Sequence, residues 1–269
     1  MHRRLLGALA AGVATLVLAP AATAAPTWAP AATAPVHPGV QTFTNGAQCT
    51  SNFVFADGDT VYVGQAAHCS GTGSATDTDG CTSQSLPIGT PVEVTGASRP
   101  GTLAYNSWIT MQQSGETDAN TCAFNDLALV RLDPADAAKV NPSVPKWGGP
   151  TGVGGTAVGQ KVYSYGNSEL RGGITLLSPK LGTDLQEQGG GWSHNVVTLT
   201  PGIPGDSGSA FLNAKGQALG VLSTLQLAPL PASNGVGDVG REIAYMHAHG
   251  VAAQLQNGTE PFKGGLPIG

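Results

Sequence analysis

Short runs of β-branched and aromatic residues recur along most of the chain, separated by glycine, proline, asparagine and aspartate. Residues 52–55 and 60–63 are two such runs, and the Asp-Gly pair at 57–58 between them is typical of a β-hairpin turn. The other runs that we predict to be strands lie at 91–94, 102–105, 127–132, 161–165, 174–177, 196–199, 209–212 and 218–223. Short strands at this spacing predict an all-β barrel or sandwich.

The spacing of the recurring residues changes near the C-terminus. Ile243, His247, Val251 and Leu255 recur every four residues, which predicts an amphipathic helix over 241–256 that packs against the body, followed by a tail at 257–269. A segment rich in proline and glycine separates the predicted strands into two groups. We therefore expect a linker at 141–155 between a first unit at 48–140 and a second unit at 156–240.

The N-terminus has the pattern of a targeting segment. Basic residues at 2–4 precede an apolar stretch at 5–18, and the Ala-Thr-Ala at 22–24 is a small-residue cleavage site. This pattern predicts a signal peptide at 1–24 and a secreted protein. The apolar stretch is shorter than the ~20 residues that span a bilayer, so we expect no membrane association after cleavage. Residues 25–47 are rich in alanine, proline and threonine, and we expect an extended leader or short pro-segment there.

Composition narrows the range of partners. The 269 residues suffice for one large domain or for two barrels of roughly 100 residues each. With 11% charged residues and a net charge of −5, the sequence has no basic patch, and we expect no nucleic-acid partner. The 4 cysteines of an exported chain predict two disulfides, for which three connectivities exist. They lack the paired short spacing of a zinc site, so we expect no metal and no cofactor.

Three separated motifs carry candidate chemistry. Residues 205–209, Gly-Asp-Ser-Gly-Ser, place Ser207 between glycines, where a tight turn exposes the hydroxyl and leaves backbone N–H groups free. A serine nucleophile needs a base, and the base needs a third group to orient it. His68 in Ala-Ala-His-Cys at 66–69 and Asp126 at the start of an apolar run supply these groups. Each residue alone could be a turn, core or capping residue, but those interpretations do not explain why all three occur together.

These motifs, in the order His, Asp, Ser, resemble those of the chymotrypsin-like (trypsin-like) serine peptidase family, and secreted bacterial members most of all. The resemblance covers roughly Cys49 to Gly250. It implies two antiparallel Greek-key β-barrels with the active site in the cleft between them, and a C-terminal α-helix. His68 and Asp126 would belong to the first barrel and Ser207 to the second. The backbone N–H groups of Gly205 and Ser207 would form the oxyanion hole.

The resemblance also implies covalent and ionic links. It favours a Cys49–Cys69 disulfide, with Cys81 and Cys122 then forming the other. No Ile-Val-Gly-Gly start is present to supply a terminal amine to the aspartate before the nucleophile, Asp206. In some bacterial members an arginine of the second barrel takes this role, and Arg171 is the candidate here. The alternative is that Arg171 is a solvated surface residue.

Substrate preference is read from the same resemblance. Pro201 stands where tryptic members carry an acidic residue, so cleavage after lysine or arginine is not expected. Leu222 stands where glutamate-specific members carry a histidine. Ser223 resembles the serine that borders the substrate strand and helps to solvate the buried aspartate. Leu225 replaces a frequent glycine and would narrow the pocket mouth, so we expect small or medium apolar residues before the cleaved bond.

The sequence therefore predicts a secreted serine endopeptidase, expected to be a monomer, that hydrolyses protein or peptide substrates through an acyl-enzyme. The alternative is a secreted binding protein on the same scaffold that has lost turnover. The intact set of His68, Asp126 and Ser207 favours the enzyme, because a binding module has no need of all three groups.

Overall fold

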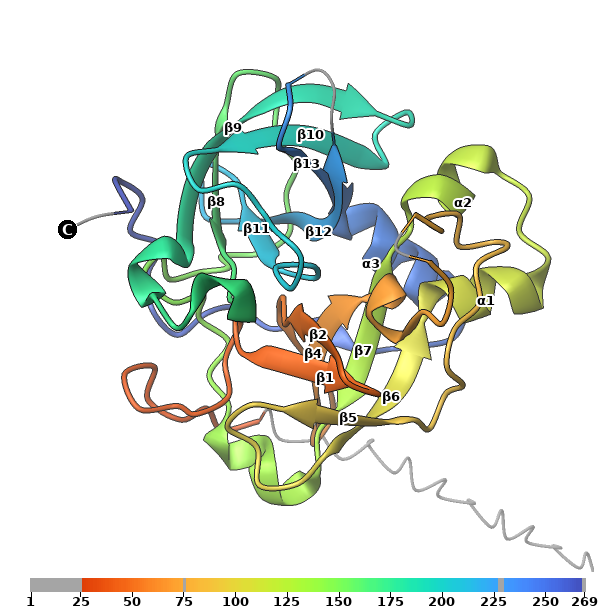
Figure 1. Cartoon of the computed structure of the whole chain (residues 1–269). Coiled ribbons are helices and arrows are strands. Elements are labelled where there is room, and N and C mark those ends of the chain that lie inside the picture. The colour runs from red at the N-terminus through yellow and green to blue at the C-terminus, as the bar shows by residue number, and fades with distance from the viewer. Residues whose placement is uncertain (1–25, 75, 227–229, 268–269) are drawn as a thin grey trace, which may run out of the picture.

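The chain folds into two β-sheet halves, as a computed structural model shows for residues 26–74, 76–226 and 230–267 (Figure 1). The predicted signal peptide at 1–24 lies outside these described residues. The first half is an eight-stranded antiparallel sheet, and the second is a closed six-stranded barrel. Within the described residues three α-helices accompany them, namely α1 (Ser107–Ser114), α2 (Ala119–Phe124) and α3 (Val239–Ala248).

The first sheet has the strand order β14-β3-β4-β7-β6-β5-β1-β2. Its interior is filled by β-branched and aliphatic residues, including Val54, Val63, Leu103 and Val130, all of which are fully buried. Such side chains fit a pleated surface with one face turned to the core. The strands are β1 (Gln41–Thr44), β2 (Ala47–Thr50), β3 (Val54–Asp57), β4 (Thr60–Ala66), β5 (Pro91–Val94), β6 (Gly101–Asn106), β7 (Leu127–Arg131) and β14 (Gln254–Leu255).

The second half closes on itself in the order β10-β13-β12-β11-β8-β9. Val162, Val196, Phe211, Leu219 and Val236 form its core. Closure leaves no unpaired sheet edge in this half, whereas β2 and β14 remain edges of the first sheet. The strands are β8 (Lys161–Tyr165), β9 (Pro179–Gln188), β10 (Ser193–Thr198), β11 (Ala210–Leu212), β12 (Ala218–Gln226) and β13 (Ser233–Asp238).

The expectation of an extended leader at 25–47 is wrong for the described part of that segment. Val36 and Val40 are buried in the core of the first sheet, and β1 lies between β2 and β5. The inward side chains of β1 are Thr42 and Thr44, both buried. Threonine is β-branched and fits a strand, so the high threonine content that suggested a leader is compatible with a sheet.

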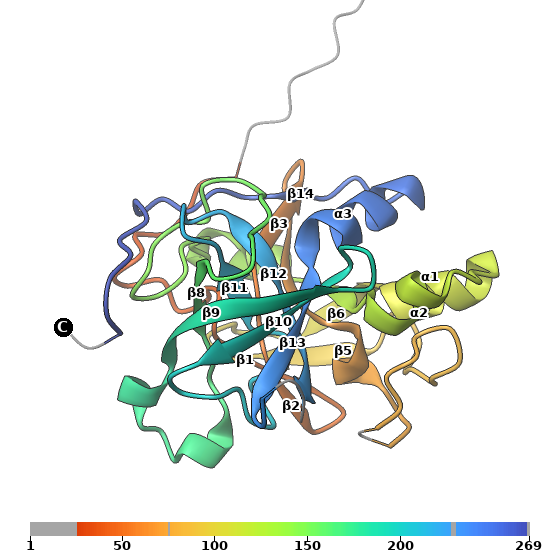
Figure 2. The same ribbon diagram turned by 90° about the horizontal axis from the view of Figure 1, so that it is seen from above.

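The helix predicted at 241–256 is present but spans Val239–Ala248. Asp238 begins it by accepting a hydrogen bond from the Arg241 N–H, and Gly250, with φ +86°, follows its end. Leu255, placed in the helix by its spacing, instead lies in β14, which pairs with β3 (Figure 2). Residues 141–155, the predicted linker, connect the halves without a helix or strand of their own.

The strand predicted at 174–177 is also wrong. Thr175–Leu177 form a 3₁₀ turn, and Leu176 is 68% exposed. An isolated apolar run cannot by itself distinguish a buried strand from an exposed turn. Among the described residues, no helix has both the length and the apolar character needed to cross a membrane.

Candidate active site

His68 and Asp126 are brought together by the pairing of two neighbouring strands. His68 lies in the 3₁₀ turn Ala67–Ser70 directly after β4, and Asp126 directly precedes β7. Because Ala66 pairs with Leu127, the two side chains start from adjacent strand ends. The His68 Nδ1 atom lies 2.7 Å from Asp126 Oδ2, and the His68 N–H donates to Asp126 Oδ1 at 2.9 Å. One carboxylate thus fixes both the ring and the backbone of the histidine.

The second half contributes a further donor to the same carboxylate. The hydroxyl of Ser223, in β12, donates to Asp126 Oδ2 at 2.5 Å. Asp126 is 3% exposed and accepts three hydrogen bonds. Burial lowers the pKa of His68, but the charge and hydrogen bond of Asp126 outweigh burial and hold that pKa above its ordinary value. The pair therefore stabilises an imidazolium form of His68.

Ser207 lies on the turn that precedes β11, in the second half. Its carbonyl accepts a hydrogen bond from the Thr50 N–H of β2 at 2.8 Å, which ties this turn to the edge of the first sheet. Gly208 has φ +88°, and a Cβ there would lie 2.5 Å from the Thr50 carbonyl oxygen. Both the backbone angle and the close approach require glycine at this position.

His68 and Ser207 line the same pocket, one from each half of the molecule. Within the described residues, the Ser207 hydroxyl makes no hydrogen bond to the His68 ring. Catalytic hydrogen bonds are often long in the absence of substrate, so the shared pocket is the more informative relation. The structure thus places all three residues predicted as a catalytic trio around one site.

Free backbone donors lie beside Ser207. Gly205 has φ +92°, and in the described chain neither its N–H nor that of Ser207 donates to another protein group. A Cβ at position 205 would lie 2.1 Å from Gln48 Oε1, which is the end of a flexible side chain, so the backbone angle of Gly205 is the main reason for glycine at this position. Two unpaired N–H groups beside a serine can bind a carbonyl oxygen as it gains negative charge.

The pocket has a volume of about 670 Å³. Ser223 and Leu225, two of the predicted substrate-binding residues, line it, whereas Pro201 does not. The carbonyl of Pro201 instead accepts a hydrogen bond from Arg171 at 2.9 Å. The expectation that Pro201 contacts substrate stays a prediction, and its neighbour Gly202 lies on the pocket wall.

Asp206 is fully buried and holds two cations. Arg171, the partner predicted from the sequence, lies 2.5 Å from Asp206 Oδ2. Lys180, which sequence reasoning missed, lies 3.0 Å from the same oxygen and is itself fully buried. Burial lowers the pKa of Lys180 to about 8, although the charge of Asp206 opposes that shift. No motif marks Lys180 in the sequence of β9.

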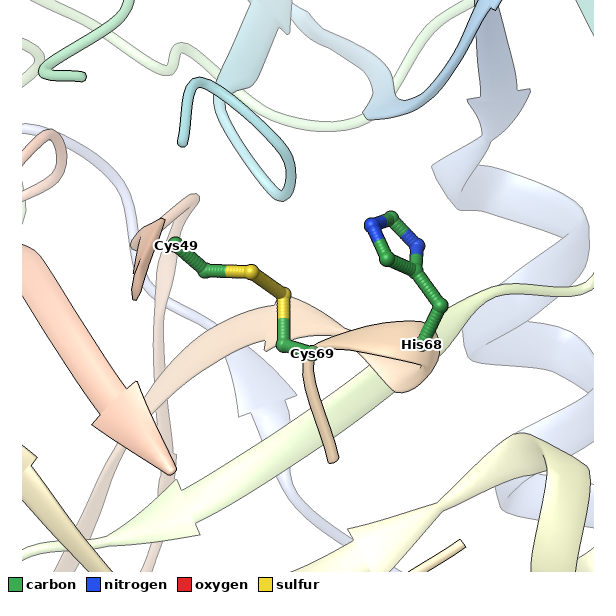
Figure 3. Close-up of side chains that lie close together, drawn as sticks. All are labelled: Cys49, His68 and Cys69. Carbon is green, nitrogen blue, oxygen red and sulfur yellow. A yellow bond between two sulfur atoms is a disulfide. The ribbon is translucent and has the colours of Figure 1, made fainter. Parts of the chain in front are cut away.

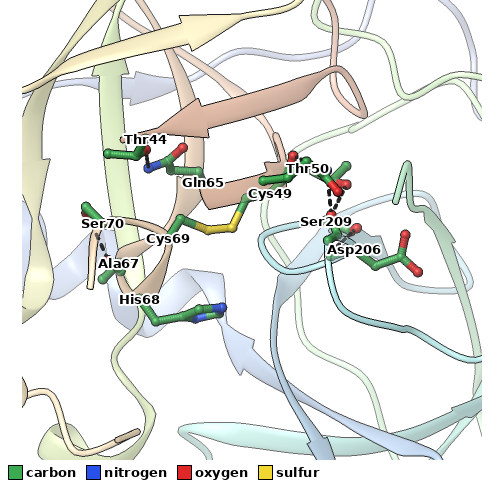
Figure 4. The surroundings of a disulfide bond; sticks show 12 residues. Thr44, Cys49, Thr50, Gln65, Ala67, His68, Cys69, Ser70, Asp206 and Ser209 are labelled. Atoms are coloured by element: carbon green, nitrogen blue, oxygen red, sulfur yellow. Dashed lines mark hydrogen bonds between the residues drawn. A yellow bond between two sulfur atoms is a disulfide. The ribbon is translucent and has the colours of Figure 1, made fainter. Parts of the chain in front are cut away.

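Both disulfides have the predicted pairing, Cys49–Cys69 and Cys81–Cys122. The first joins β2 to the turn that carries His68 (Figure 3). On the other side of this disulfide, Thr50 is next to the segment with Asp206 and Ser209 (Figure 4). The Thr50 hydroxyl donates to the Gly205 carbonyl at 2.8 Å. The bridge therefore links the turn that carries His68 to the strand that contacts the turn with Ser207.

The described residues contain two clusters of potential metal ligands, and each includes both sulfurs of a disulfide. Metal coordination by cysteine uses the thiolate, which a disulfide does not provide. His68 of the first cluster is in addition bonded to Asp126. These clusters do not fit a metal while the disulfides are intact.

No protein-family model matches the sequence, and no curated protein matches it either. Solved structures do resemble the fold. Protease A of Thermobifida fusca has a TM-score of 0.54 at 18% identity, covering 83% of this chain and 99% of its own. The Nocardiopsis protease NAPase has a TM-score of 0.51 at 16% identity, covering 82% and 98%. A glutamic-acid-specific serine protease has a TM-score of 0.53 at 18% identity, covering 82% and 100%.

These neighbours, together with the closed barrel, the second antiparallel sheet and the C-terminal helix, define the class of the molecule. The chain has a serine-protease fold. More specifically, it has the two-barrel fold of the bacterial chymotrypsin-like proteases, as the sequence predicted.

Proposed function

We propose that this protein is a serine endopeptidase that acts through Ser207, His68 and Asp126. The observation that carries the proposal is that His68, which Asp126 holds from behind, lines the same pocket as Ser207. His68 lies on the wall from the first half, and Ser207 and Gly205, each with a free N–H group, lie on the wall from the second. A histidine held by a buried carboxylate opposite a serine is the arrangement that nucleophilic catalysis requires.

The reaction follows from these positions. Ser207 Oγ attacks the carbonyl carbon of the peptide bond while its proton passes to His68 Nε2. The carbonyl oxygen becomes an oxyanion that accepts hydrogen bonds from the N–H groups of Gly205 and Ser207. His68 then donates the proton to the departing amine, which leaves an acyl-enzyme on Ser207. Water, deprotonated by His68, attacks the acyl carbon and releases the acid, which restores the serine.

Asp126 acts by keeping His68 in the required tautomer. With Nδ1–H directed at Asp126 Oδ2, Nε2 is the free acceptor that faces the pocket. The raised pKa of His68 strengthens it as a base, while keeping it protonated to a higher pH than a free histidine. Activity should therefore appear as pH rises through the pKa of His68.

We further propose a preference for small or medium apolar residues before the cleaved bond. Gly202, Ile203, Leu222 and Leu225 supply the apolar lining of the pocket. Of the described residues on that lining, none is lysine or arginine, and His68 is the sole histidine. A cleavage profile on a diverse peptide pool tests this preference. Cleavage mainly after arginine, lysine or glutamate would contradict it.

A second candidate is a binding protein that retains the fold without turnover. The absence of a hydrogen bond between Ser207 and the His68 ring in the described structure is the observation that favours it. Labelling of the purified protein with a fluorophosphonate separates the two candidates, because this reagent reacts with an activated serine. We expect labelling of the wild-type protein and of Ser114→Ala, an exposed serine remote from the pocket, and none of Ser207→Ala. A wild-type protein that stays unlabelled would overturn the proposal of catalysis.

We also propose that the protein is secreted and acts on proteins or peptides outside the cell. The two disulfides support export, since such bonds persist in oxidising compartments. The N-terminal sequence of the protein recovered from culture medium tests it, with Ala25 expected as the first residue. Recovery only from the cell interior, with the N-terminus intact, would contradict export.

A further inference from the structure

A second buried carboxyl group lies beside the proposed catalytic aspartate. Glu242, in the first turn of α3, is fully buried. Its Oε1 atom accepts a hydrogen bond from the backbone N–H of Asp126 at 3.0 Å. Its Oε2 atom has no hydrogen-bond partner among the described residues. The function proposed above assigns no role to this side chain, although it contacts the backbone of one of the three catalytic residues.

The surroundings of Glu242 contain no compensating cation. The titratable groups that face it are the carboxyl groups of Asp126 and Asp238 and the phenol of Tyr105, and it forms no ion pair within the described chain. Burial, followed by the negative charges of these two carboxylates, raises its pKa well above the ordinary value. Both causes favour the neutral form of this carboxyl group.

The contact completes the hydrogen bonding of Asp126. The Asp126 carboxylate is already occupied by His68 N–H, His68 Nδ1 and the Ser223 hydroxyl. Its backbone N–H points to the other side, toward α3, where Glu242 is the acceptor. The position of Asp126 is thus fixed from both ends, by His68 and Ser223 at the carboxylate and by Glu242 at the backbone.

The charge of Glu242 matters for His68 as well. An ionised Glu242 would add a second negative charge close to Asp126, which would raise the proton affinity of His68 further. Less of the histidine would then be available as a base at neutral pH. A neutral Glu242 provides an acceptor for the Asp126 N–H without this cost.

We propose that Glu242 is a positioning residue of the active site, which anchors the backbone N–H of Asp126 from helix α3. This inference rests on the proposed roles of Asp126 and His68. It assigns to α3 a part in catalysis beyond packing, because the helix then supplies one of the hydrogen bonds that hold the His68–Asp126 pair in place.

Two substitutions separate this role from a structural one. Glu242→Gln keeps a neutral side chain with an acceptor oxygen, whereas Glu242→Met keeps the length and removes the acceptor. Ile243→Val, one position along the same helix, is the control for general loosening of α3. The measurement is the rate of fluorophosphonate labelling per folded molecule, followed from pH 5 to 9.

We expect Glu242→Gln to label at the wild-type rate with the same pH midpoint. We expect Glu242→Met to label about 10- to 100-fold more slowly, as for a misplaced catalytic group, and Ile243→Val to remain at the wild-type rate. Wild-type labelling by Glu242→Met would overturn the inference. A lower pH midpoint for Glu242→Gln would also overturn it, because that shift would mean that Glu242 is ionised in the native protein. If Glu242→Met does not fold, the pH midpoint of Glu242→Gln still decides the charge state.

A failure of the proposed function is distinguishable from a failure of this inference. If the wild-type protein is not labelled at Ser207, the catalytic proposal fails. The role of Glu242 is then tested by the pKa of His68, measured by NMR of its ring nitrogens in the folded protein. We expect the same pKa in wild type and Glu242→Gln, and a lower one in Glu242→Met, where the hold on Asp126 is weaker. An unchanged pKa in Glu242→Met would overturn the inference.

Discussion

Lys180 Nζ lies 3.0 Å from the carboxylate of Asp206, and both side chains are fully buried. Lys180 also donates to the carbonyls of Thr200 and Pro201, at 3.3 Å each. Asp206 immediately precedes Ser207, so the ion pair and these hydrogen bonds hold the whole segment that leads to the proposed nucleophile. Asp206, Arg171 and Lys180 form a buried charge cluster of one carboxylate and two cations. Because the cluster has a net positive charge, the loss of any one of the three side chains should change the stability of the protein.

Substitutions in this charge cluster should lower the free energy of unfolding by unequal amounts. In Lys180→Met the Asp206 carboxylate keeps Arg171, whereas in Asp206→Asn two buried cations lose their counter-ion. We expect Asp206→Asn to lower the free energy of unfolding by about 3–5 kcal/mol, and Lys180→Met by clearly less. Urea denaturation at pH 7 measures both. Equal losses would show that Arg171 alone does not neutralise Asp206.

The pKa of Lys180 predicts that the stability of the protein depends on pH. Its pKa is about 8 in the folded protein, against an ordinary value of 10.5. Between these two values the unfolded chain binds more protons, so the contribution of Lys180 to stability increases as pH rises from 8 to 10.5. The stability of wild type relative to Lys180→Met should rise by roughly 3 kcal/mol across that range. A constant difference between the two proteins would contradict this prediction.

The contribution of His194 to stability should decrease as pH rises, opposite to that of Lys180. It is buried, with Nδ1 3.2 Å from Asp184 and Nε2 3.5 Å from Asp238. Burial alone lowers the pKa of His194, but the hydrogen bond to Asp184 and the nearby carboxylates of Asp184 and Asp238 raise it to about 9, from an ordinary 6.5. The folded state therefore binds more protons between these values. The stabilisation is complete below pH 6.5 and is lost as pH rises through 9.

Between pH 6.5 and 9, the contribution of His194 to the free energy of unfolding should fall by roughly 3 kcal/mol. Urea midpoints of wild type and His194→Gln, measured from pH 6 to 10, isolate this contribution because all other titrating groups are common to both proteins. We expect the advantage of wild type to shrink with rising pH. An advantage that grew with pH would mean that His194 is neutral in the folded protein.

Asp126→Asn tests the orientation of His68. The substitution removes the charge that raises the pKa of His68 and disturbs the tautomer that leaves Nε2 free. By analogy with the serine-protease triad, we expect turnover to fall about 10⁴-fold. The acidic midpoint of the pH profile should also move down. Peptide hydrolysis measured from pH 4 to 9 checks both effects, with Asp57→Asn, at an exposed hairpin turn, as control. Normal turnover by Asp126→Asn would refute the role assigned to this carboxylate.

The sequence predicts those parts of the molecule that are indicated by residues close together in the chain. Strands such as 161–165 and 218–223 were recognisable because apolar residues recur within each run. The Arg171–Asp206 pair followed from family resemblance and is confirmed by the structure. The contact of Asp126 with His68 and the pocket that His68 shares with Ser207 agree with expectation, although the catalytic roles of these residues stay a prediction.

What the sequence did not predict depends on contacts between distant segments. Strand β13 contains two glycines and few apolar side chains, so its sequence alone resembles a loop, and it forms because β10 and β12 lie on either side. Lys180, Glu242 and His194 are charged or polar residues that are buried only because carboxyl or amide groups from other elements meet them. Their burial cannot be predicted without the tertiary structure.

The segment after α3 links the two halves. The helix packs against β12 and β13 of the second half, and the chain then adds β14 to β3 of the first. Farther along, the carbonyl of Glu260 accepts the Gly149 N–H, and Phe262 packs against Tyr163. The segment after α3 therefore contacts both halves of the molecule. His68 and Ser207 belong to different halves, so the distance between the proposed base and the proposed nucleophile depends in part on this C-terminal segment, which contributes no residue to the pocket.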